Sequence, residues 1–254
     1  MATNLVLTGV DGGSNIIGFI PPILSGLVGW WWPGVDQATS IKNWAPGGVD
    51  ASVGGSPTYT TTYANLKSMT NYLQTSVPDT ASLTAIVVSK CPDTMADNAH
   101  RPILIGCQSV DAGNAGATIG FQVYVASTTG VPQANITMGA GYNTGSVVQQ
   151  VGPTLTPPDF SVFKMIVGVV NSAGATRVLK NPSNGTSASL ASTGTRVPHS
   201  VNRLRIGSSH AAGITGLNDC CHAAIYNRAL SDPEITTHYT FVKGWLQAKR
   251  SITI

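Results

Sequence analysis

The sequence predicts an all-β protein, a sandwich of two antiparallel sheets that ends in one short helix. Three observations predict it. Short segments in which apolar and polar residues alternate recur along most of the chain, as in half-buried strands. Clusters of Gly, Pro, Asn and Ser separate these segments, as turns do. One segment near the C-terminus instead has its apolar residues at helical spacing. A chain of 254 residues is a usual length for one such domain.

The expected strands follow one another along the middle of the chain. In the last of them, Leu204 and Ile206 alternate with two arginines and are expected to face the core. Residues 62–69 are a candidate for one short helical turn between the strands. The clearest strand segments are residues 83–90, 103–107, 119–126, 163–169 and 203–206.

The C-terminal helix is expected over residues 231–249. Ser231 is a candidate N-cap, and Glu234 three residues later completes a capping box. Pro233 is tolerated in the first turn because the first amides of a helix have no intrahelical acceptor. The apolar face of the helix consists of Ile235, Tyr239, Val242, Trp245 and Leu246.

The segments around this helix resemble the laminin-G-like domains and the concanavalin A-like lectins and glucanases. The resemblance rests on residues 203–208 (RLRIGS), 224–235 (AIYNRALSDPEI) and 26–34 (GLVGWWWPG). Residues 42–55 and 71–75 are also similar, although Asn43 and Trp44 stand where an acid and a serine are usual. The resemblance implies a jelly roll over residues 26–254. It implies little about function, because lectins, glycosidases, peptide-binding proteins and virion parts share this sandwich.

Residues 1–25 form an apolar, glycine-rich arm that precedes the resemblance. We expect it to contact a neighbouring subunit or to fold back on the domain as an edge strand. Its start lacks Lys and Arg, which argues against a signal peptide. Residues 16–28 are apolar but too few to span a bilayer, so no membrane insertion is expected.

Composition excludes several classes of function. Charged residues make up 10% of the chain, whereas about 25% is typical, and so poor a surface charge favours coverage by partners. A net charge of +3, with scattered Lys and Arg, argues against nucleic acid as a partner. The cysteines are too few for a disulfide scaffold and lack the spacing of a zinc site, so they are expected to be free thiols. They are Cys91, Cys107, Cys220 and Cys221.

The acids argue against catalysis. Ten of the eleven are aspartates, and the single glutamate, Glu234, already has a place in the capping box. Glycoside hydrolysis generally needs two carboxylates that flank the bond. The glucanases of the resembled family carry a strand motif with two glutamates, and that motif is absent here. The five histidines share no metal spacing, and no G-x-S-x-G elbow occurs. We therefore expect a protein that is not an enzyme.

Carbohydrate is the ligand that the resemblance favours. Trp31 or Trp44 would offer an aromatic ring on which a sugar packs, and Asn218 and Asp219 are expected in the loop before the last core strand. The other interpretation of the tryptophans places Trp30 and Trp32 in the core and Trp31 under the arm or at an interface. The candidate carbohydrate-binding residues are Trp31, Trp44, His210, Asn218 and Asp219.

A calcium ion at the rim of the sandwich is the one cofactor that the resemblance implies. Calcium prefers six to eight oxygen ligands, and Asp and Asn supply them. Against this ion, His222 and Ala223 stand where the family has its acid pair, and Asn and Asp also form turns. The candidate ligands are Asp93, Asp97, Asn98 and Asp219.

Together these features favour a non-catalytic structural or attachment component of a bacteriophage virion. It would be a tail, baseplate or head-surface protein whose lectin-like domain binds a host glycan. Its partners would be other virion subunits or further copies of itself. The first alternative is a free-standing carbohydrate-binding lectin module. The less favoured alternative is a glycosidase or depolymerase.

Overall fold

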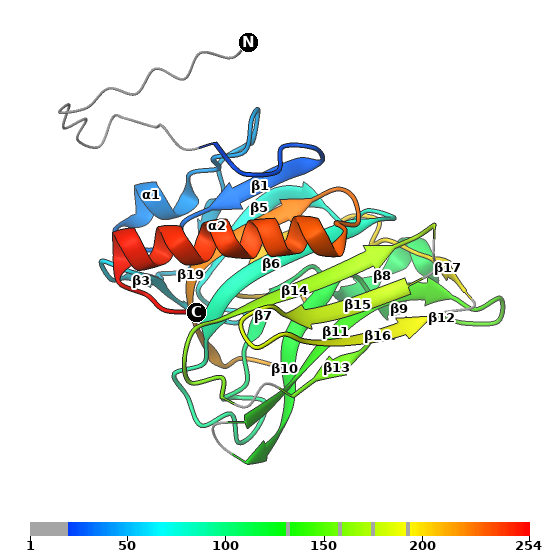
Figure 1. The fold of residues 1–254 in the computed structure, drawn as a ribbon. Coiled ribbons are helices and arrows are strands. Elements are labelled where there is room, and N and C mark those ends of the chain that lie inside the picture. Colours follow the sequence, from blue (N-terminus) through cyan, green and yellow to red (C-terminus); the bar gives the residue numbers. More distant parts are fainter. Residues whose placement is uncertain (1–19, 131–132, 157–158, 174–175, 192–193) are drawn as a thin grey trace, which may run out of the picture.

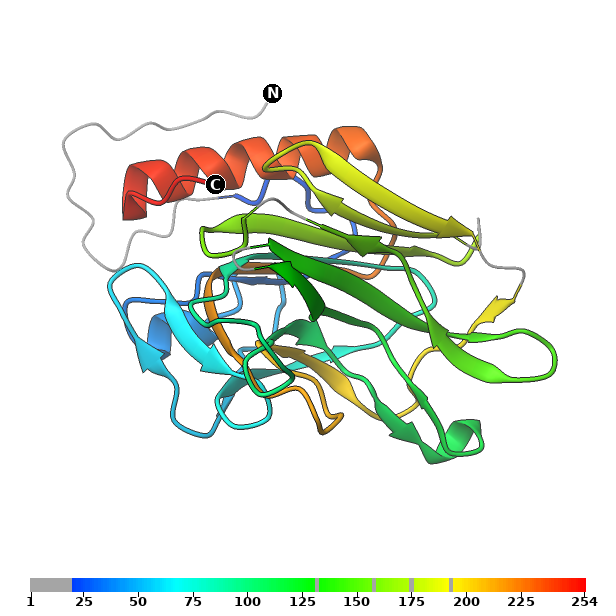
Figure 2. The same ribbon diagram turned by 90° about the horizontal axis from the view of Figure 1, so that it is seen from below.

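Two antiparallel sheets lie face to face in the computed structural model, and a long helix covers the outer face of one of them (Figures 1 and 2). The structure describes residues 20–130, 133–156, 159–173, 176–191 and 194–254. The two antiparallel sheets and the C-terminal helix confirm the predicted fold class. Most of the predicted N-terminal arm, residues 1–19, lies outside the described residues. No helix in the described ranges is long and apolar enough to cross a membrane.

The helix-covered sheet has eight strands. In spatial order they are β16 (Thr186–Ala191), β15 (Thr176–Asn181), β14 (Lys164–Asn171), β6 (Leu83–Lys90), β19 (Leu217–Tyr226), β4 (Ala64–Lys67) and β3 (Thr58–Tyr59), while β1 (Leu27–Trp31) also pairs with β19. The long helix on its outer face is α2 (Asp232–Arg250). A five-residue helix, α1 (Gln37–Ile41), follows β1.

The second sheet has nine strands. In spatial order they are β12 (Val148–Val151), β11 (Gln133–Asn143), β10 (Gln122–Gly130), β7 (Ile103–Gly106), β18 (Arg203–Ile206), β5 (Tyr72–Pro78) and β2 (Ser52–Gly54), while β13 (Thr154–Leu155) and β17 (Thr195–Arg196) pair with β11. A separate hairpin joins β8 (Ser109–Asp111) to β9 (Ala117–Ile119) through the short 3-10 helix η2 (Ala112–Asn114).

The predicted strand segments all contain strands of these sheets. Leu204 and Ile206 are buried as the alternation predicted. The helical turn predicted over residues 62–69 is wrong. That stretch contains β4, in which Ala64 and Leu66 point into the core at alternate positions, so the period is two. The sequence analysis also missed α1, whose N-cap Asp36 accepts a hydrogen bond from the Thr39 amide at 2.7 Å.

Two apolar layers hold the molecule together. The inner core lies between the sheets and contains Leu66, Phe121 and Ile206. The outer core lies between the eight-stranded sheet and α2 and contains Val88 and Val242. Cys220 belongs to the inner core and Cys221 to the outer one, as expected for neighbours on a strand. All four cysteines are buried free thiols.

The start of α2 confirms the predicted role of Glu234. The Ser231 amide donates to Glu234 Oε2 at 2.8 Å, which is the return bond of a capping box. The Arg228 guanidinium donates to Glu234 Oε1 at 2.5 Å. The hydrogen bonds from Arg228 and Ser231 lower the pKa of Glu234 to about 2. One carboxylate therefore joins the end of β19 to the first turn of the helix.

Three buried polar side chains connect α2 to β19 by hydrogen bonds. His222 Nδ1 lies 3.0 Å from the Trp31 carbonyl, which can only accept, so Nδ1 carries the proton. His222 Nε2 then accepts from His238 Nε2 at 3.0 Å, and His238 Nδ1 accepts from the Tyr226 hydroxyl at 3.1 Å. With both rings neutral, each of the four ring nitrogens has a partner.

Burial keeps these two rings neutral. It lowers the pKa of His238 to about 3. It also lowers the pKa of His222 well below the usual value, and His238 and then Arg250 add to that effect. Tyr226 is the other titratable group in the chain of hydrogen bonds, and burial raises its pKa. The docking of α2 therefore depends on uncharged imidazoles.

We expect Glu234→Ala to lower the free energy of unfolding by about 0.5–2 kcal/mol, the usual effect of losing a helix cap. Urea denaturation at pH 7 measures it. Thr237→Ala, an exposed change in the same helix, is the control and should stay within about 0.5 kcal/mol of the native protein. Equal stability of the native protein and the Glu234 variant would show that the carboxylate does not stabilise the helix.

Stability should fall as the pH drops below about 6.5, the pKa of an unfolded histidine. The folded pKa of His238 is lower, so the unfolded chain binds more protons between the two values, and acid favours unfolding. Each buried histidine adds about 1.4 kcal/mol per pH unit to this slope. Urea titrations between pH 7.5 and 4 measure it. His238→Phe should reduce the slope by about that amount, and an unchanged slope would contradict the account.

Candidate functional site

The three consecutive tryptophans in and just after β1 are buried and do not form a sugar platform. Trp30 and Trp32 lie in the outer core, as one interpretation predicted. Trp31 is fully buried between the two sheets, so its predicted roles at an interface, under the arm or in carbohydrate binding are wrong. The physical reason is that β1 is covered on both faces, by the second sheet and by α2. Trp44 is half-buried and packs against the outer core.

Asn218 and Asp219 lie inside β19 and not in the predicted loop. Both side chains are buried. Asp219 accepts from Asn65 Nδ2 at 2.5 Å and lies 3.6 Å from Lys90 Nζ. Burial raises the pKa of Asp219 despite these partners. Neither residue has an exposed surface to offer to a sugar or a calcium ion, which corrects both predictions for this pair.

The other predicted calcium ligands belong to the loop between β6 and β7. Asp97 Oδ1 lies 2.7 Å from His100 Nδ1, and that contact lowers the pKa of Asp97. Asp93 accepts from the amide of the next residue, and Asn98 accepts from Arg101 at 3.3 Å. These are the turn contacts that the competing interpretation proposed. Within the described ranges, no three His, Cys, Asp or Glu side chains gather as a metal site would require. The rim calcium stays a prediction.

His210 is the predicted binding residue that borders a surface hollow. The hollow has a volume of about 410 Å³, and we call it the rim hollow. The ring donates from Nε2 to the Arg203 carbonyl at 2.9 Å, which leaves Nδ1 as an acceptor. Burial lowers the pKa of His210, so the ring is neutral at pH 7. The rim hollow is lined by Ser109, Val110, Thr118, His210, Ala211 and Ala212.

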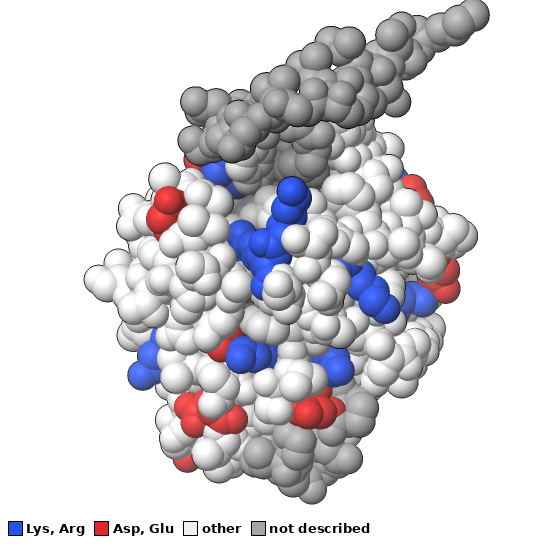
Figure 3. Space-filling view, turned by 60° about the vertical axis from the view of Figure 1, so that its left-hand side comes forward, with Lys and Arg blue, Asp and Glu red and all other residues white. Residues whose placement is uncertain are grey.

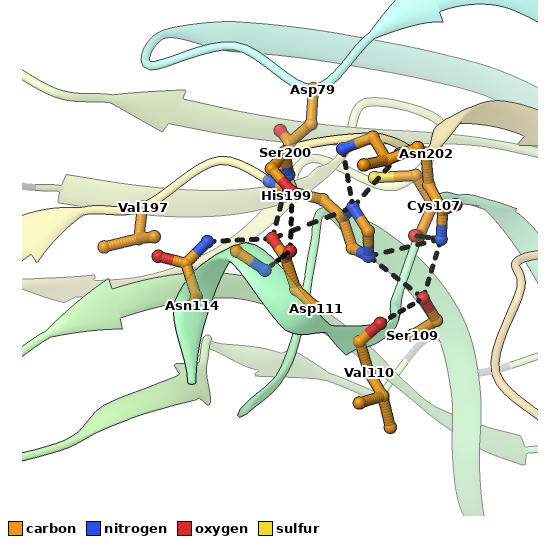
Figure 4. A network of polar contacts seen from close by, with 12 residues as sticks. Asp79, Cys107, Ser109, Val110, Asp111, Asn114, Val197, His199, Ser200 and Asn202 are labelled. Atoms are coloured by element: carbon orange, nitrogen blue, oxygen red, sulfur yellow. Dashed lines mark hydrogen bonds and ion pairs between the residues drawn. The ribbon is translucent and has the colours of Figure 1, made fainter. Parts of the chain in front are cut away.

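A network of polar contacts adjoins the rim hollow at Ser109 and Val110 (Figure 4). The Asp111 carboxylate accepts from both the hydroxyl and the amide of Ser200, at 2.6 and 2.8 Å. It also accepts from Gly113 at 3.0 Å and from Asn114 at 2.8 Å. Burial opposes ionisation of Asp111, but these hydrogen bonds outweigh it and lower its pKa to about 2. The carboxylate thereby joins the β8–β9 hairpin to the loop that contains Ser200.

A second carboxylate fixes the same loop to the sandwich. Asp79, next to β5, forms a fully buried ion pair with Arg196 of β17. Asp79 Oδ2 also accepts from the amides of Phe121 and His199, at 3.2 and 2.9 Å. The other terminal nitrogen of Arg196 donates to the carbonyls of Gly141 and Val197, so the ion pair has further hydrogen bonds on both sides. The ion pair therefore holds the loop after β17 against the sandwich, beside the β8–β9 hairpin that forms part of the rim hollow.

The order Ser109, His199, Asp111 invites comparison with a hydrolase triad. Ser109 Oγ lies 2.9 Å from His199 Nε2, but His199 Nδ1 accepts from the amides of Val201 and Asn202, at 3.2 and 3.1 Å. The single proton of the neutral ring is therefore on Nε2, where a general base needs a lone pair. His199 Nδ1 is also 3.8 Å from Asp111, too far for a hydrogen bond. The arrangement stabilises the loop and cannot activate Ser109.

Sequence reasoning missed this network. Asp79, Asp111 and His199 come from three distant parts of the chain, and each has an ordinary local context. The fold brings them together because the end of β5, the end of β8 and the loop after β17 are neighbours in space.

The surface is sparsely charged. The face in Figure 3 shows Lys and Arg in small, separate groups.

We expect Ser109 to be inert toward a fluorophosphonate probe, because the tautomer of His199 prevents removal of the Ser109 proton. Intact-mass spectrometry after overnight incubation at pH 7.5 measures the adduct, with trypsin as the positive control. An adduct that disappears in Ser109→Ala would contradict the assignment of the tautomer.

No protein-family model matches the chain, and no curated protein matches its sequence. Solved structures do match its fold. The binding domain of botulinum neurotoxin serotype G has a TM-score of 0.60 at 11% identity, over 85% of this chain and 51% of that chain. The binding domain of Paraclostridial Mosquitocidal Protein 1 has a TM-score of 0.55 at 14% identity, over 87% and 52%.

A third match is the ligand binding domain of botulinum neurotoxin serotype D in complex with N-acetylneuraminic acid. Its TM-score is 0.54 at 8% identity, over 85% of this chain and 51% of that one. The chain thus spans about half the length of the toxin domains that it matches. At these identities the likeness shows a shared fold, and none of these three structures is a virion protein. The chain therefore shares its fold with about half of each of these binding domains.

Proposed function

We propose that the protein is a non-catalytic carbohydrate-binding module and that its ligand enters the rim hollow. The observation that carries the proposal is the neutral lining of this hollow, together with the buried network that holds one of its walls. Its walls come from the β8–β9 hairpin and the loop after β18, and two buried carboxylates fix the hairpin and the neighbouring loop. A binding site held in shape before the ligand arrives avoids the cost of ordering it later.

The lining combines the two kinds of surface that a sugar ring presents. Thr118 offers an exposed hydroxyl, and His210 offers the acceptor Nδ1. Val110 is 65% exposed and, with two alanines, gives an apolar patch for the C–H face of a ring. A few polar groups among apolar ones are typical of ligand sites. A neutral lining favours an uncharged part of a glycan over a strongly anionic one.

Two further observations support binding without catalysis. The solved structures that share the fold are binding domains, one of them in complex with N-acetylneuraminic acid. The single glutamate of the chain is committed to the cap of α2, and Ser109 faces a protonated nitrogen. We therefore expect no release of reducing sugar from any glycan that the protein binds.

A structural or attachment role in a larger assembly, such as a phage virion, is the second candidate. The low content of charged residues favours it, as do the exposed Ile20 and Leu24 where the predicted arm meets the domain. Light scattering of the full chain and of residues 26–254 tests this role. Loss of assembly with an unchanged melting temperature would support it, and a monomeric full chain would contradict it.

A glycan array followed by calorimetry with the strongest glycan tests the carbohydrate proposal. Thr118→Trp fills the rim hollow and should raise the Kd for that glycan at least tenfold. Val162→Trp places the same ring at another exposed position and should leave the Kd within twofold. Absence of any bound glycan on the array, or an unchanged Kd in the Thr118 variant, would overturn the proposal.

A further inference from the structure

A second hollow lies between the turn that joins β15 to β16 and the first two turns of α2. Its volume is about 470 Å³, and we call it the helix groove. Figure 2 shows the β15–β16 hairpin, in yellow, lying along the helix. We propose that the helix groove binds a neutral sugar ring and is a site separate from the rim hollow. The residues that carry the argument are Lys180, Asn181, Thr186, Asp232, Thr236 and Tyr239.

The charges of the helix groove cancel each other. Lys180 Nζ lies 3.0 Å from Asp232 Oδ2, and the carboxylate side chain is 76% exposed. Among the described groups, nothing donates to the other oxygen, Asp232 Oδ1. A carboxylate held by one oxygen and open at the other is well suited to accept hydrogen bonds from sugar hydroxyls. Because the pair is neutral, an anionic ligand gains little here.

The helix side of the groove also provides apolar surface. Tyr239 is half-buried, and its hydroxyl donates to the Ile254 carbonyl at 3.2 Å, which fixes the ring. Ile235, one turn earlier, lies at the base of the groove and is buried. A fixed aromatic ring beside an aliphatic side chain gives the C–H face of a pyranose a surface to cover.

The base of the groove contains a polar group without a partner. Asn181 is fully buried, and its Oδ1 accepts from the Ser183 amide at 3.1 Å. Its Nδ2 has no acceptor among the described groups. This nitrogen is fully covered by neighbouring atoms, so it makes the base of the groove polar without itself contacting a bound ring.

The helix groove and the rim hollow belong to different elements. The groove is formed by the β15–β16 hairpin and α2, whereas the hollow is formed by the β8–β9 hairpin and the loop after β18. Figures 1 and 2 place β8 and β9 away from α2. A module with two weak sugar sites gains apparent affinity for a glycan surface, because the second contact is intramolecular.

Amide-resolved NMR titrations test the proposal. The probes are the methyl glycosides of glucose, galactose, mannose and N-acetylglucosamine, and N-acetylneuraminic acid serves as the anionic comparison. We expect saturable shifts at Asp232, Thr236 and Thr186 with at least one neutral sugar. Thr236→Trp should raise the Kd of that sugar at least tenfold. Thr237→Trp, the neighbouring exposed position outside the groove, should leave it within twofold.

Thermal melting confirms that both tryptophan variants are folded, and Asp232→Asn replaces Thr236→Trp if that variant is not. Thr118→Trp blocks the rim hollow and should not change the shifts at the groove, which separates this proposal from the first. The proposal is overturned if no neutral sugar gives saturable shifts at the groove. It is also overturned if Thr236→Trp leaves the Kd unchanged, or if only N-acetylneuraminic acid binds there.

Discussion

The docking of α2 on the outer face of the eight-stranded sheet is the contact on which the rest of the structure depends. The helix covers the outer faces of β1, β6, β14 and β19, while the second sheet covers their inner faces. The three tryptophans in and just after β1 are therefore divided between two cores. At its centre, hydrogen bonds hold His222 and His238 between Trp31 and Tyr226, and burial keeps both rings neutral. Protonation of either ring would place a charge in an apolar layer that has no carboxylate to pair with it among these contacts. The helix groove exists only while this contact holds.

Local sequence signals were enough for the clearest strands and for the C-terminal helix, but not for β4 or α1. Alternation located the strands around Leu204 and Ile206, and the spacing of Ser231 and Glu234 located the start of the helix. These local signals did not predict how the sheets and the helix stack into layers. A period of two distinguishes the two faces of a strand, but it does not say what covers each face. Trp31 was therefore expected near the surface, although both of its neighbours were placed correctly.

The candidate site depends even more on contacts between distant residues. His210 was predicted as a binding residue and does border the rim hollow, but the groups that make the neighbouring wall rigid were not predicted. Asp111 is paired with Ser200 across 89 residues of the chain, and Asp79 with Arg196 across 117. Nothing near either aspartate in the sequence distinguishes it from Asp93 or Asp97, which only stabilise turns. Burial separates the two groups, and burial is a property of the fold.

The central claim is that a fixed, neutral hollow at the rim of the sandwich receives a sugar. A crystal structure of the protein with the strongest glycan from the array tests it most directly. The account predicts a sugar ring in the rim hollow, with one hydroxyl within hydrogen-bond distance of His210 Nδ1 and no movement of Asp111 or His199. A glycan bound elsewhere while the rim hollow stays empty, or a hollow that must rearrange around the sugar, would contradict it.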